Sequence, residues 1–476
     1  METPKTLSVL KNHALAMKVD TVIKNGKIVS PKGVILGGVA IDDGIFVAIG
    51  RDQNLPQAER TIDAGGKYIL PGLIDPHVHW GTKKDYDLEV RTETRSCAHG
   101  GVTTVMNLLG HAKTYTAESY LKTYEKWKRI TEEKSIVDTV FSISPHTSEH
   151  MEEIPRYFRE LGVPAFKFFY GYKGEQAKVI GVGSVDDGLL YAGLKTIGEL
   201  GYPAIAQAHC EDVEIFYWLE PKLRKMGDDR LAAWTEARPN FLESLDTAKL
   251  INLAKVTNCP FYVVHVSAGE TVDEIQKGKL EGVKVIGETC PHYLAVTKDD
   301  EKLGVYGKVN PPLRGRASIE RLWRGINEGT IDCIGTDNVP CYKENKKGNI
   351  WEAHPGIPNG SASMLPVMIT EGVLKNRISI EKLVEICCSN TAKILGIYPR
   401  KGTISIGSDA DLVIVDMDKT LEVTPETLQT GTDFTIYEGW KLKGWPVLTM
   451  VRGNIVLEGD QVIGKPGTGK IILSPS

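Results

Sequence analysis

The sequence lacks the features that mark membrane, secreted and nucleic-acid-binding proteins. No apolar run approaches the ~18 residues of a membrane-spanning helix, and no long block of like charges interrupts the chain. The first residues mix both charges and lack the apolar core of a secretory signal. The net charge is only -4. We therefore expect a cytoplasmic protein whose main partner is neither a nucleic acid nor a membrane.

The cysteines of the chain also lack a motif that would suggest pairing. Its 8 cysteines are scattered, and none forms a Cys-x-x-Cys motif. In a chain of 476 residues this pattern indicates reduced thiols and argues against a disulfide framework. A hydrophobic content of 41% with 25% charged residues is ordinary for a globular protein with a sizeable core.

What the chain does contain is strand-like sequence at both ends. Near the N-terminus, Asn25-Gly26 and Asp43-Gly44 separate β-branched runs, which is typical of hairpins. The same texture returns at 407–416 and 448–457. Residues 1–18 precede the first such strand and are expected to form a short extension.

Between these ends, apolar strand-like runs alternate with helical patterns. Such alternation predicts parallel β-α-β units, and eight of them predict a (β/α)₈ TIM barrel with its active site at the C-terminal ends of the strands. The predicted strands are 68–73, 102–106, 137–143, 165–169, 204–209, 261–266, 283–286 and 331–335.

Polar side chains occur at the C-terminal ends of several predicted strands. His77 and His79 follow the first strand and share one face, so they could hold a metal ion. Alone, the pair fits surface histidines equally well. A buried polar group that has found its partner, or a helix cap, would explain any one of the other residues. Together they converge on one cavity, which predicts a shared site built from His77, His79, Lys167, His209, His265 and Asp337.

The residue types indicate the metal. Neutral imidazoles and a carboxylate suit Zn²⁺, with Mn²⁺, Co²⁺ or Fe²⁺ as alternatives. A protonated lysine cannot ligate, and lysine is almost never buried without a partner. A carbamate formed from Lys167 and CO₂ would be an anionic ligand with two oxygens, able to bridge two divalent ions. Together with Asp337 and a hydroxide it would leave the site slightly positive, which suits polarising a carbonyl.

At these residues the chain resembles the amidohydrolase superfamily. In particular it is similar to the cyclic amidohydrolases, namely D-hydantoinase/dihydropyrimidinase, allantoinase and dihydroorotase. The resemblance covers roughly residues 19–460 and is carried by the segments 72–79, 166–173, 263–267, 288–294, 310–314, 335–337 and 407–413.

The resemblance implies a domain organisation. A barrel of residues 68–399 would be flanked by a small β-sandwich domain made from both chain ends, 19–67 and 400–476. It also implies a homotetramer or a homodimer. The substrate would be a small cyclic amide.

The resemblance further implies a binuclear metal centre. One ion would be held by His77, His79 and Asp337. The other would be held by His209 and His265, with Lys167, modified to N6-carboxylysine, bridging the two. A hydroxide that bridges the ions would attack the ring amide carbonyl, and Asp337 would pass its proton to the leaving nitrogen.

Three further residues match substrate contacts of the family. Tyr172 matches the hydantoinase tyrosine that holds the oxyanion and the substrate, although Tyr170 could compete for that role. Asn310 and Asn359 match positions that contact the ring. For both, an ordinary turn residue is the simpler explanation.

Departures from the family narrow the function. Dihydroorotases carry an Arg two residues after the second His to bind a carboxylate, and this chain has Gly81 there, after Trp80. We therefore expect a hydantoinase/dihydropyrimidinase-like hydrolase of a cyclic ureide, imide or amide. The alternatives are an allantoinase, an amidohydrolase acting on a lactam or open-chain amide, and a non-catalytic dihydropyrimidinase-like scaffold. The filled ligand positions disfavour the scaffold.

Overall fold

The computed structural model describes residues 18–358 and 360–474, and within them an eight-stranded parallel sheet forms a barrel. The sheet runs in the order β13-β12-β11-β10-β9-β8-β7-β6, and the backbone N–H of His79 donates to the carbonyl of Asn338 (2.9 Å), which links its two edges. This confirms the predicted TIM barrel. Its strands are β6 (Leu73–Val78), β7 (Val102–Leu109), β8 (Asp138–Ile143), β9 (Ala165–Phe168), β10 (Ile205–Ala208), β11 (Phe261–Val263), β12 (Val285–Thr289) and β13 (Cys333–Ile334).

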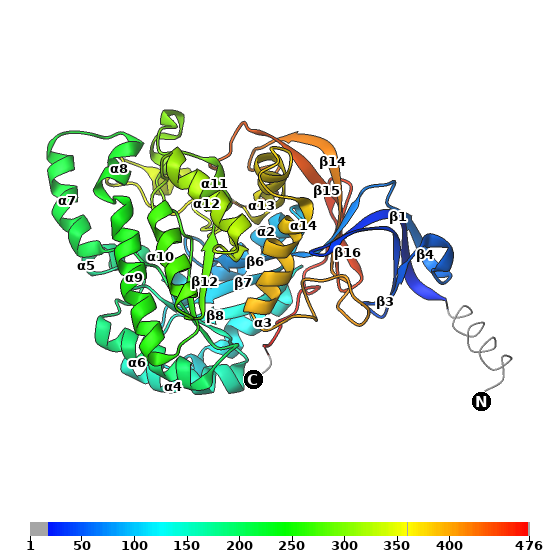
Figure 1. The fold of residues 1–476 in the computed structure, drawn as a ribbon, viewed down its shortest axis with the longest axis horizontal. Coiled ribbons are helices and arrows are strands. Elements are labelled where there is room, and N and C mark those ends of the chain that lie inside the picture. The colour runs from blue at the N-terminus through cyan, green and yellow to red at the C-terminus, as the bar shows by residue number, and fades with distance from the viewer. Residues whose placement is uncertain (1–17, 359, 475–476) are drawn as a thin grey trace.

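Helices surround the barrel (Figure 1). α4 shows why they form. The Thr147 side chain caps its first turn, Ile154 and Phe158 are buried on one face, and Gly162 ends it with φ 65°. The main outer helices are α2 (Tyr86–His99), α3 (Tyr124–Lys134), α4 (Ser148–Leu161), α6 (Asp187–Leu200), α9 (Asn240–Thr257), α10 (Gly269–Leu280) and α12 (Arg316–Glu328).

Further helices, most of them shorter, follow several strands and lie in the connecting loops. They are α5 (Gly174–Ile180), α7 (Val213–Lys225), α8 (Leu231–Ala237), α11 (Pro291–Ala295), α13 (Met364–Val367), α14 (Ile380–Val384) and α15 (Asn390–Ile394).

The interior of the barrel is filled by apolar side chains. Ile74, Met106 and Ile205 belong to one buried cluster that also contains Ile397 and Ile472 from the last part of the chain. The segment around Ile471 pairs with Thr139, at the start of β8, and so runs across the N-terminal end of the barrel. The C-terminal strand ends are left to carry polar side chains, as the fold requires.

The first predicted strand, 68–73, is wrong as a single barrel strand. The chain divides at Gly72, where an added Cβ would lie 2.1 Å from the Thr103 hydroxyl. Before it, β5 (Tyr68–Pro71) belongs to a second sheet, and after it β6 begins the barrel. His77 consequently lies within a strand, not beyond its end. The apolar pattern runs unbroken through both strands, so it could not reveal the division.

The second sheet joins both ends of the chain, as the resemblance implied. Its nine strands run β17-β16-β15-β14-β5-β1-β2-β3, with β4 paired to β1. In Figure 1 the blue N-terminal strands lie beside the orange and red C-terminal strands. The bounds are β1 (Val19–Ser30), β2 (Gly33–Asp42), β3 (Ile45–Gly50), β4 (Ala58–Asp63), β14 (Leu412–Glu422), β15 (Lys441–Val451), β16 (Asn454–Glu458) and β17 (Gln461–Val462).

This sheet has its own core. Ile23, Val39 and Phe46 from the N-terminal strands pack in one cluster with Leu412 and Met450 from the C-terminal strands. Neither end could bury these residues alone. The domain boundaries at 67/68 and 399/400 stay predictions, although β5 carries the second sheet past the first of them to Pro71. The expected extension lies, except for Lys18, outside the described residues.

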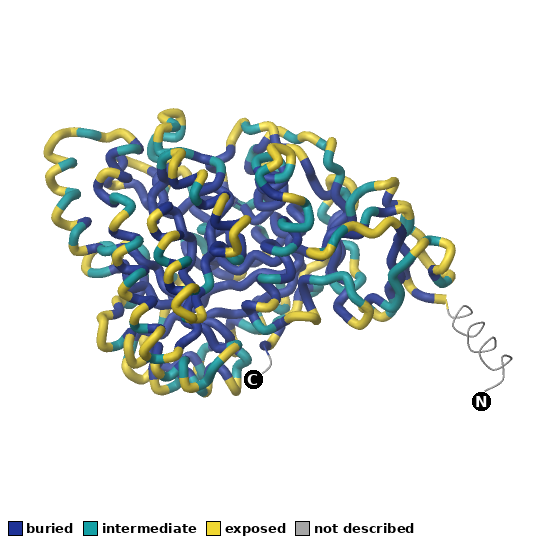
Figure 2. The backbone as a smooth tube through the Cα atoms, viewed as in Figure 1, coloured by how far each residue is buried: buried dark blue, intermediate teal, exposed yellow. Residues whose placement is uncertain are grey.

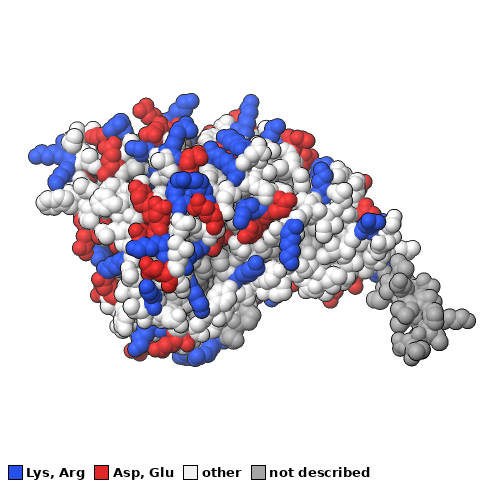
Figure 3. Space-filling view, in the orientation of Figure 1, with Lys and Arg blue, Asp and Glu red and all other residues white. Residues whose placement is uncertain are grey.

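Burial and charge are distributed as expected for an α/β barrel. Most residues of the strands are buried, and the exposed residues lie mainly along the outer helices and loops (Figure 2). On the face shown in Figure 3, acidic and basic side chains are interspersed. Within residues 18–358 and 360–474, no helix combines the length and the hydrophobicity needed to cross a membrane.

Candidate metal centre and active site

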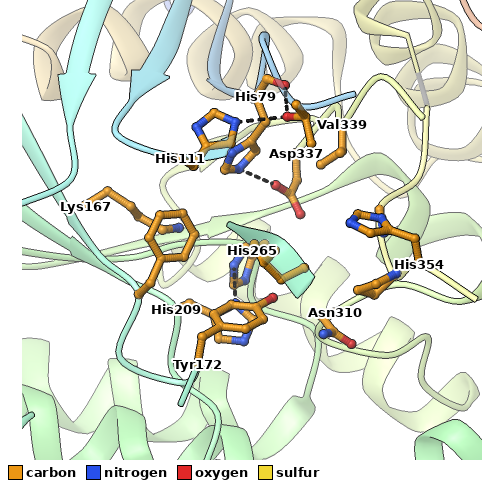
Figure 4. A pocket seen from close by; sticks show the side chains of 15 residues that line it. His79, His111, Lys167, Tyr172, His209, His265, Asn310, Asp337, Val339 and His354 are labelled. Carbon is orange, nitrogen blue, oxygen red and sulfur yellow. Dashed lines mark hydrogen bonds and ion pairs between the residues drawn. The ribbon is translucent and has the colours of Figure 1, made fainter. Parts of the chain in front are cut away.

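A pocket opens at the C-terminal ends of the barrel strands (Figure 4). It encloses about 500 Å³ of empty space, including its open mouth. Most of the predicted site residues line it, and the two exceptions are His77, which contacts His79 from beside the pocket, and Asn359, which lies outside the described residues. The predicted residues in its wall are His79, Lys167, Tyr172, His209, His265, Asn310 and Asp337.

One half of the site is formed by His77, His79 and Asp337. The Nε2 atoms of His77 and His79 lie 3.1 Å apart, and the Asp337 Oδ1 lies 3.0 Å from His79 Nε2 and 3.4 Å from His77 Nε2. All three residues are buried. Their ligand atoms lie within 4.8 Å of one another, so they could hold one metal ion. Two facing imidazole nitrogens and a carboxylate form a donor set that suits a divalent ion.

The other half is formed by His209 and His265. The Nδ1 of His209 lies 2.9 Å from the Nε2 of His265. The halves meet where the ring of His77 is stacked 5.4 Å from that of His265, and the Lys167 Nζ lies 3.5 Å from His77 Nε2. Figure 4 shows the Lys167 amine directed between the two groups. The six residues therefore form one cluster.

Two buried carboxylates hold the imidazoles in place. Glu288 accepts from His77 Nδ1 (2.8 Å) and from the backbone N–H of His265 (2.8 Å), so it fixes a residue in each half. Glu211 lies 3.2 Å from His209 Nε2 and is paired with the fully buried Arg238. Such partners set the tautomer and leave the opposite nitrogen free to ligate.

Sequence reasoning missed both carboxylates. Glu211 stands two residues after His209, and Glu288 opens a family-like motif. A pattern of alternate residues could have suggested Glu211. Nothing in the sequence ties Glu288 to His77, because 211 residues separate them.

The backbone at two of the candidate ligand positions is strained. His265 has φ 41° and Asp337 has φ 50°, in the left-handed region where non-glycine residues cost about 1–3 kcal/mol. Asp75 supports the second turn, since it accepts hydrogen bonds from the Thr336 N–H (2.9 Å) and hydroxyl (2.6 Å) and from the Ser361 hydroxyl (2.7 Å). The fold therefore aims Asp337 into the pocket at a cost.

Burial controls the charges of the cluster. It lowers the pKa of Lys167 to about 8, although Asp337 and Glu288 oppose the shift. It also lowers the pKa of His79, His209 and His265, which favours neutral imidazoles with free lone pairs.

Asp337 behaves in the opposite way. Burial alone would raise its pKa, but attraction to His77 and the hydrogen bond from His79 outweigh burial and hold it below its usual range. This carboxyl is therefore ionised at neutral pH.

The two candidate tyrosines face different ways. The Tyr172 ring lies 4.5 Å from that of His209 and lines the pocket, whereas Tyr170 donates to Asp187 (2.5 Å) and is not among the pocket's lining residues. Burial raises the pKa of Tyr172, so its hydroxyl stays protonated and able to donate. Geometry thus favours Tyr172 over Tyr170.

Two pocket histidines were not foreseen. His111, in the loop after β7, places its Nε2 2.9 Å from the Thr82 hydroxyl and its ring edge-on to His79. His354 accepts from the backbone N–H of Gly356 (3.0 Å) at its Nδ1. Both come from loops without a periodic pattern, so only the folded chain could bring them here.

Comparison with known proteins agrees with this geometry. The family model described as "Amidohydrolase family" matches residues 238–456. L-hydantoinase of Paenarthrobacter aurescens is 34% identical over 95% of this chain and 98% of its own. Allantoinase of Escherichia coli is 30% identical over 96% and 99%.

A solved structure shares the whole architecture. The L-hydantoinase (dihydropyrimidinase) from Arthrobacter aurescens superposes with a TM-score of 0.88 at 32% identity, covering 96% of this chain and 100% of that one. Because both the sequence and the fold match along nearly the full length, the chain belongs to the amidohydrolase family, in the branch that contains the hydantoinases, dihydropyrimidinases and allantoinases.

Proposed function

We propose that this enzyme opens the amide bond of a cyclic ureide or imide, as its hydantoinase and dihydropyrimidinase relatives are named for doing. The observation that carries the proposal is the convergence of four histidines, Lys167 and Asp337 at one pocket with a protonated tyrosine in its wall.

The cluster suits two divalent ions, with Zn²⁺ the first choice and Mn²⁺, Co²⁺ or Fe²⁺ the alternatives. His77, His79 and Asp337 would hold one ion, His209 and His265 the other, and Lys167 would bridge them as N6-carboxylysine. Bound ions of this kind lower the pKa of water and polarise a carbonyl.

Modification of Lys167 needs an uncharged amine. A pKa of about 8 leaves an appreciable fraction of the amine neutral near pH 7. This amine attacks CO₂, a C–N bond forms, and one proton leaves, giving a carbamate. The change removes an unpaired buried cation and supplies an anion between the two halves.

Asp337 and Tyr172 would carry the rest of the reaction. The ionised Asp337 carboxylate takes a proton from the attacking water and delivers it to the leaving ring nitrogen. The Tyr172 hydroxyl donates a hydrogen bond to the carbonyl oxygen as negative charge develops there. Asn310, whose amide oxygen accepts from the Trp234 indole N–H (3.1 Å), is held in the pocket wall and would contact the ring. Asn359 is proposed for the same role from the resemblance alone.

The segment at Gly81, which precedes Thr82 in the pocket wall, disfavours a carboxylate on the ring itself. In place of a cationic clamp, the N–H groups of Gly81 (2.6 Å) and Thr82 (3.0 Å) donate to the buried carboxyl of Glu89. Burial raises the pKa of Glu89 to about 7. A dihydroorotate-like substrate is therefore a poor fit. Allantoin is the second candidate, since allantoinase of Escherichia coli is 30% identical to this chain.

We also propose a homotetramer or homodimer in the cytoplasm. The family resemblance supports the assembly. All 8 cysteines are buried and unpaired, which supports a reducing compartment. Light scattering on a gel-filtration column would measure the assembly.

The test is ring opening by protein reconstituted with Zn²⁺ and bicarbonate. We expect hydrolysis of hydantoin or dihydrouracil to the N-carbamoyl product, little reaction with dihydroorotate, and none after chelation. Faster turnover of allantoin would favour the second candidate. If the metal-loaded protein opens none of the hydantoins, dihydropyrimidines, imides or lactams, the proposal is wrong.

A further inference from the structure

A second pocket adjoins the metal pocket and shares its wall. Tyr172, Ile180, Asn310 and Pro355 line both cavities. The outer pocket encloses about 920 Å³ of empty space, including its open mouth. A ring held at the metal centre could extend a substituent past these shared residues. This outer pocket is lined by the aromatic side chains of Tyr217, Trp234 and Trp351.

A buried lysine lies in the wall of the outer pocket. Lys308 is 2% exposed. Its Nζ lies 4.1 Å from the centre of the Trp234 ring and donates to the Trp351 carbonyl (3.2 Å). Within residues 18–358 and 360–474 it forms no ion pair with a carboxylate. Buried lysines ordinarily have such a partner, so this one is left to pair with something else.

The surroundings of Lys308 are more positive than negative. Lys346, Arg238 and Arg224 all oppose its charge, and burial together with these cations lowers its pKa to about 7. Glu220 is the carboxylate that favours its charge, and Glu220 is itself paired with Arg224 (3.4 Å). Arg238 and Arg224 are each paired with a carboxylate. An incoming anion would therefore gain mainly from the buried Lys308 and Lys346.

The other acidic residues that line the pocket are exposed to solvent. They are Glu175 and Glu352. Glu175 already pairs with Lys178 (2.6 Å), and the Glu352 carboxylate accepts from the backbone N–H of Asn349 (3.2 Å). Solvent screens exposed carboxylates, so they oppose an anion at Lys308 only weakly.

We propose that the outer pocket binds an acidic substituent of the ring substrate, with its carboxylate paired to Lys308 and its apolar linker lying along Trp234 and Trp351. The inference rests on the proposed ring-opening function and names its substrate class. The carboxylate must be separated from the ring, because Lys308 lines the outer pocket and not the pocket that would hold the ring. The linker gains contact with the indole faces, and the carboxylate gains a charge-assisted hydrogen bond.

A matched pair of substrates tests the proposal. 5-(2-Carboxyethyl)hydantoin and 5-(2-carbamoylethyl)hydantoin have nearly the same shape and differ in charge. We expect the wild-type enzyme to prefer the acid by about tenfold to a hundredfold in kcat/KM, the range for a hydrogen bond to a charged group, and mainly through KM. Equal kcat/KM for the two substrates would overturn the proposal without use of any variant.

Two variants locate the preference. In Lys308→Met the acid-to-amide ratio should fall close to one, because the stem over Trp234 is kept and the charge is removed. In Lys222→Met the ratio should stay as in the wild type, since this lysine also lies over a tryptophan, Trp218 (4.3 Å), but does not line the pocket. An unchanged ratio in Lys308→Met would assign the preference elsewhere and overturn the proposal.

Binding separates this inference from the proposed function. The same two compounds are titrated into metal-free protein, and isothermal titration calorimetry measures their binding. Tighter binding of the acid by wild type and not by Lys308→Met would support the pocket even if no ring is opened. Hydrolysis of unsubstituted hydantoin with no preference for the acid in either assay would uphold the function and reject the pocket.

Discussion

Two fully buried lysines lie at opposite ends of the same barrel and meet different surroundings. Lys167 is 2% exposed at the C-terminal ends of the strands, and Lys401 is 1% exposed near the N-terminal ends. Lys401 contacts three carboxylates, Asp138 (2.5 Å), Asp411 (2.7 Å) and Asp409 (3.0 Å). Lys167 forms no ion pair within the described part of the chain, and the distance to His77 Nε2 is 3.5 Å.

The difference decides what each amine can do. Burial disfavours the charge of both, but the three carboxylates outweigh burial and hold the pKa of Lys401 above its usual value. At Lys167 burial prevails and the pKa falls to about 8. At the N-terminal ends of the strands, the buried charges therefore neutralise one another and stabilise the fold. At the C-terminal ends, the amine of Lys167 is able to react and the histidine lone pairs are able to bind a metal.

Replacement of Lys167 should have the largest effect. Lys167→Ala removes the proposed bridge, so both ring opening and the binding of two ions per chain should be lost together. Lys173→Ala, on the loop that follows, should retain both. Metal analysis beside the rate measurement checks this. If Lys167→Ala still holds two ions, Lys167 does not bridge them.

Asp337→Ala should have the second-largest effect on activity. Loss of the proton carrier should lower kcat about a hundredfold to ten-thousandfold, with a much smaller change in substrate affinity. Steady-state kinetics with metal content determined on the same samples would measure it. A rate close to that of the wild type would remove Asp337 from the proton path.

At the N-terminal end of the barrel, Lys401→Met should lower the stability of the fold and leave the candidate metal site intact. Three buried carboxylates would lose their shared cation, which should lower the free energy of unfolding by about 3–5 kcal/mol. Urea denaturation measures this, with the exposed Lys393→Met as the control. Loss of metal from folded Lys401→Met would show that the two ends are not independent.

Tyr172→Phe should have a smaller effect on catalysis. Removal of one hydrogen-bond donor to the developing oxyanion should cost about 2–4 kcal/mol of transition-state stabilisation. Tyr170→Phe provides the matched control, since its hydroxyl bonds Asp187 away from the pocket. Equal kinetics for the two variants would move the donor role to another group.

The pH dependence of activation should be the mildest effect. The neutral amine of Lys167 is the form that captures CO₂, and its fraction rises as pH approaches about 8 from below. Reactivation of metal-free protein by bicarbonate and Zn²⁺, at constant dissolved CO₂, should therefore accelerate by about tenfold per pH unit below that value. A rate independent of pH would contradict a reactive lysine.

The ligand cluster was predictable because strand geometry is local. The strand ends of a parallel barrel converge, so polar residues that follow apolar runs identify the site. Lys167 is conspicuous because a lysine between two phenylalanines is unusual in a buried strand. The structure brings together the ligand residues that this reasoning named. Their roles in metal binding remain proposals.

The features that could not be predicted from the sequence depend on contacts between distant segments. Glu288 supports His77 across 211 residues, and His354 enters the pocket from an irregular loop. The division of one apolar run at Gly72 needed knowledge of Thr103. Composition and periodicity do not reveal which distant residues come into contact in the folded chain.

The most direct test of the account is carbon-13 NMR of protein reconstituted with labelled bicarbonate and Zn²⁺. We predict one carbamate resonance per chain in the wild type and in Lys401→Met, absent from Lys167→Ala and accompanied by ring opening only where it appears. Full ring-opening activity without a carbamate resonance would contradict the proposal that a reactive buried lysine completes this site.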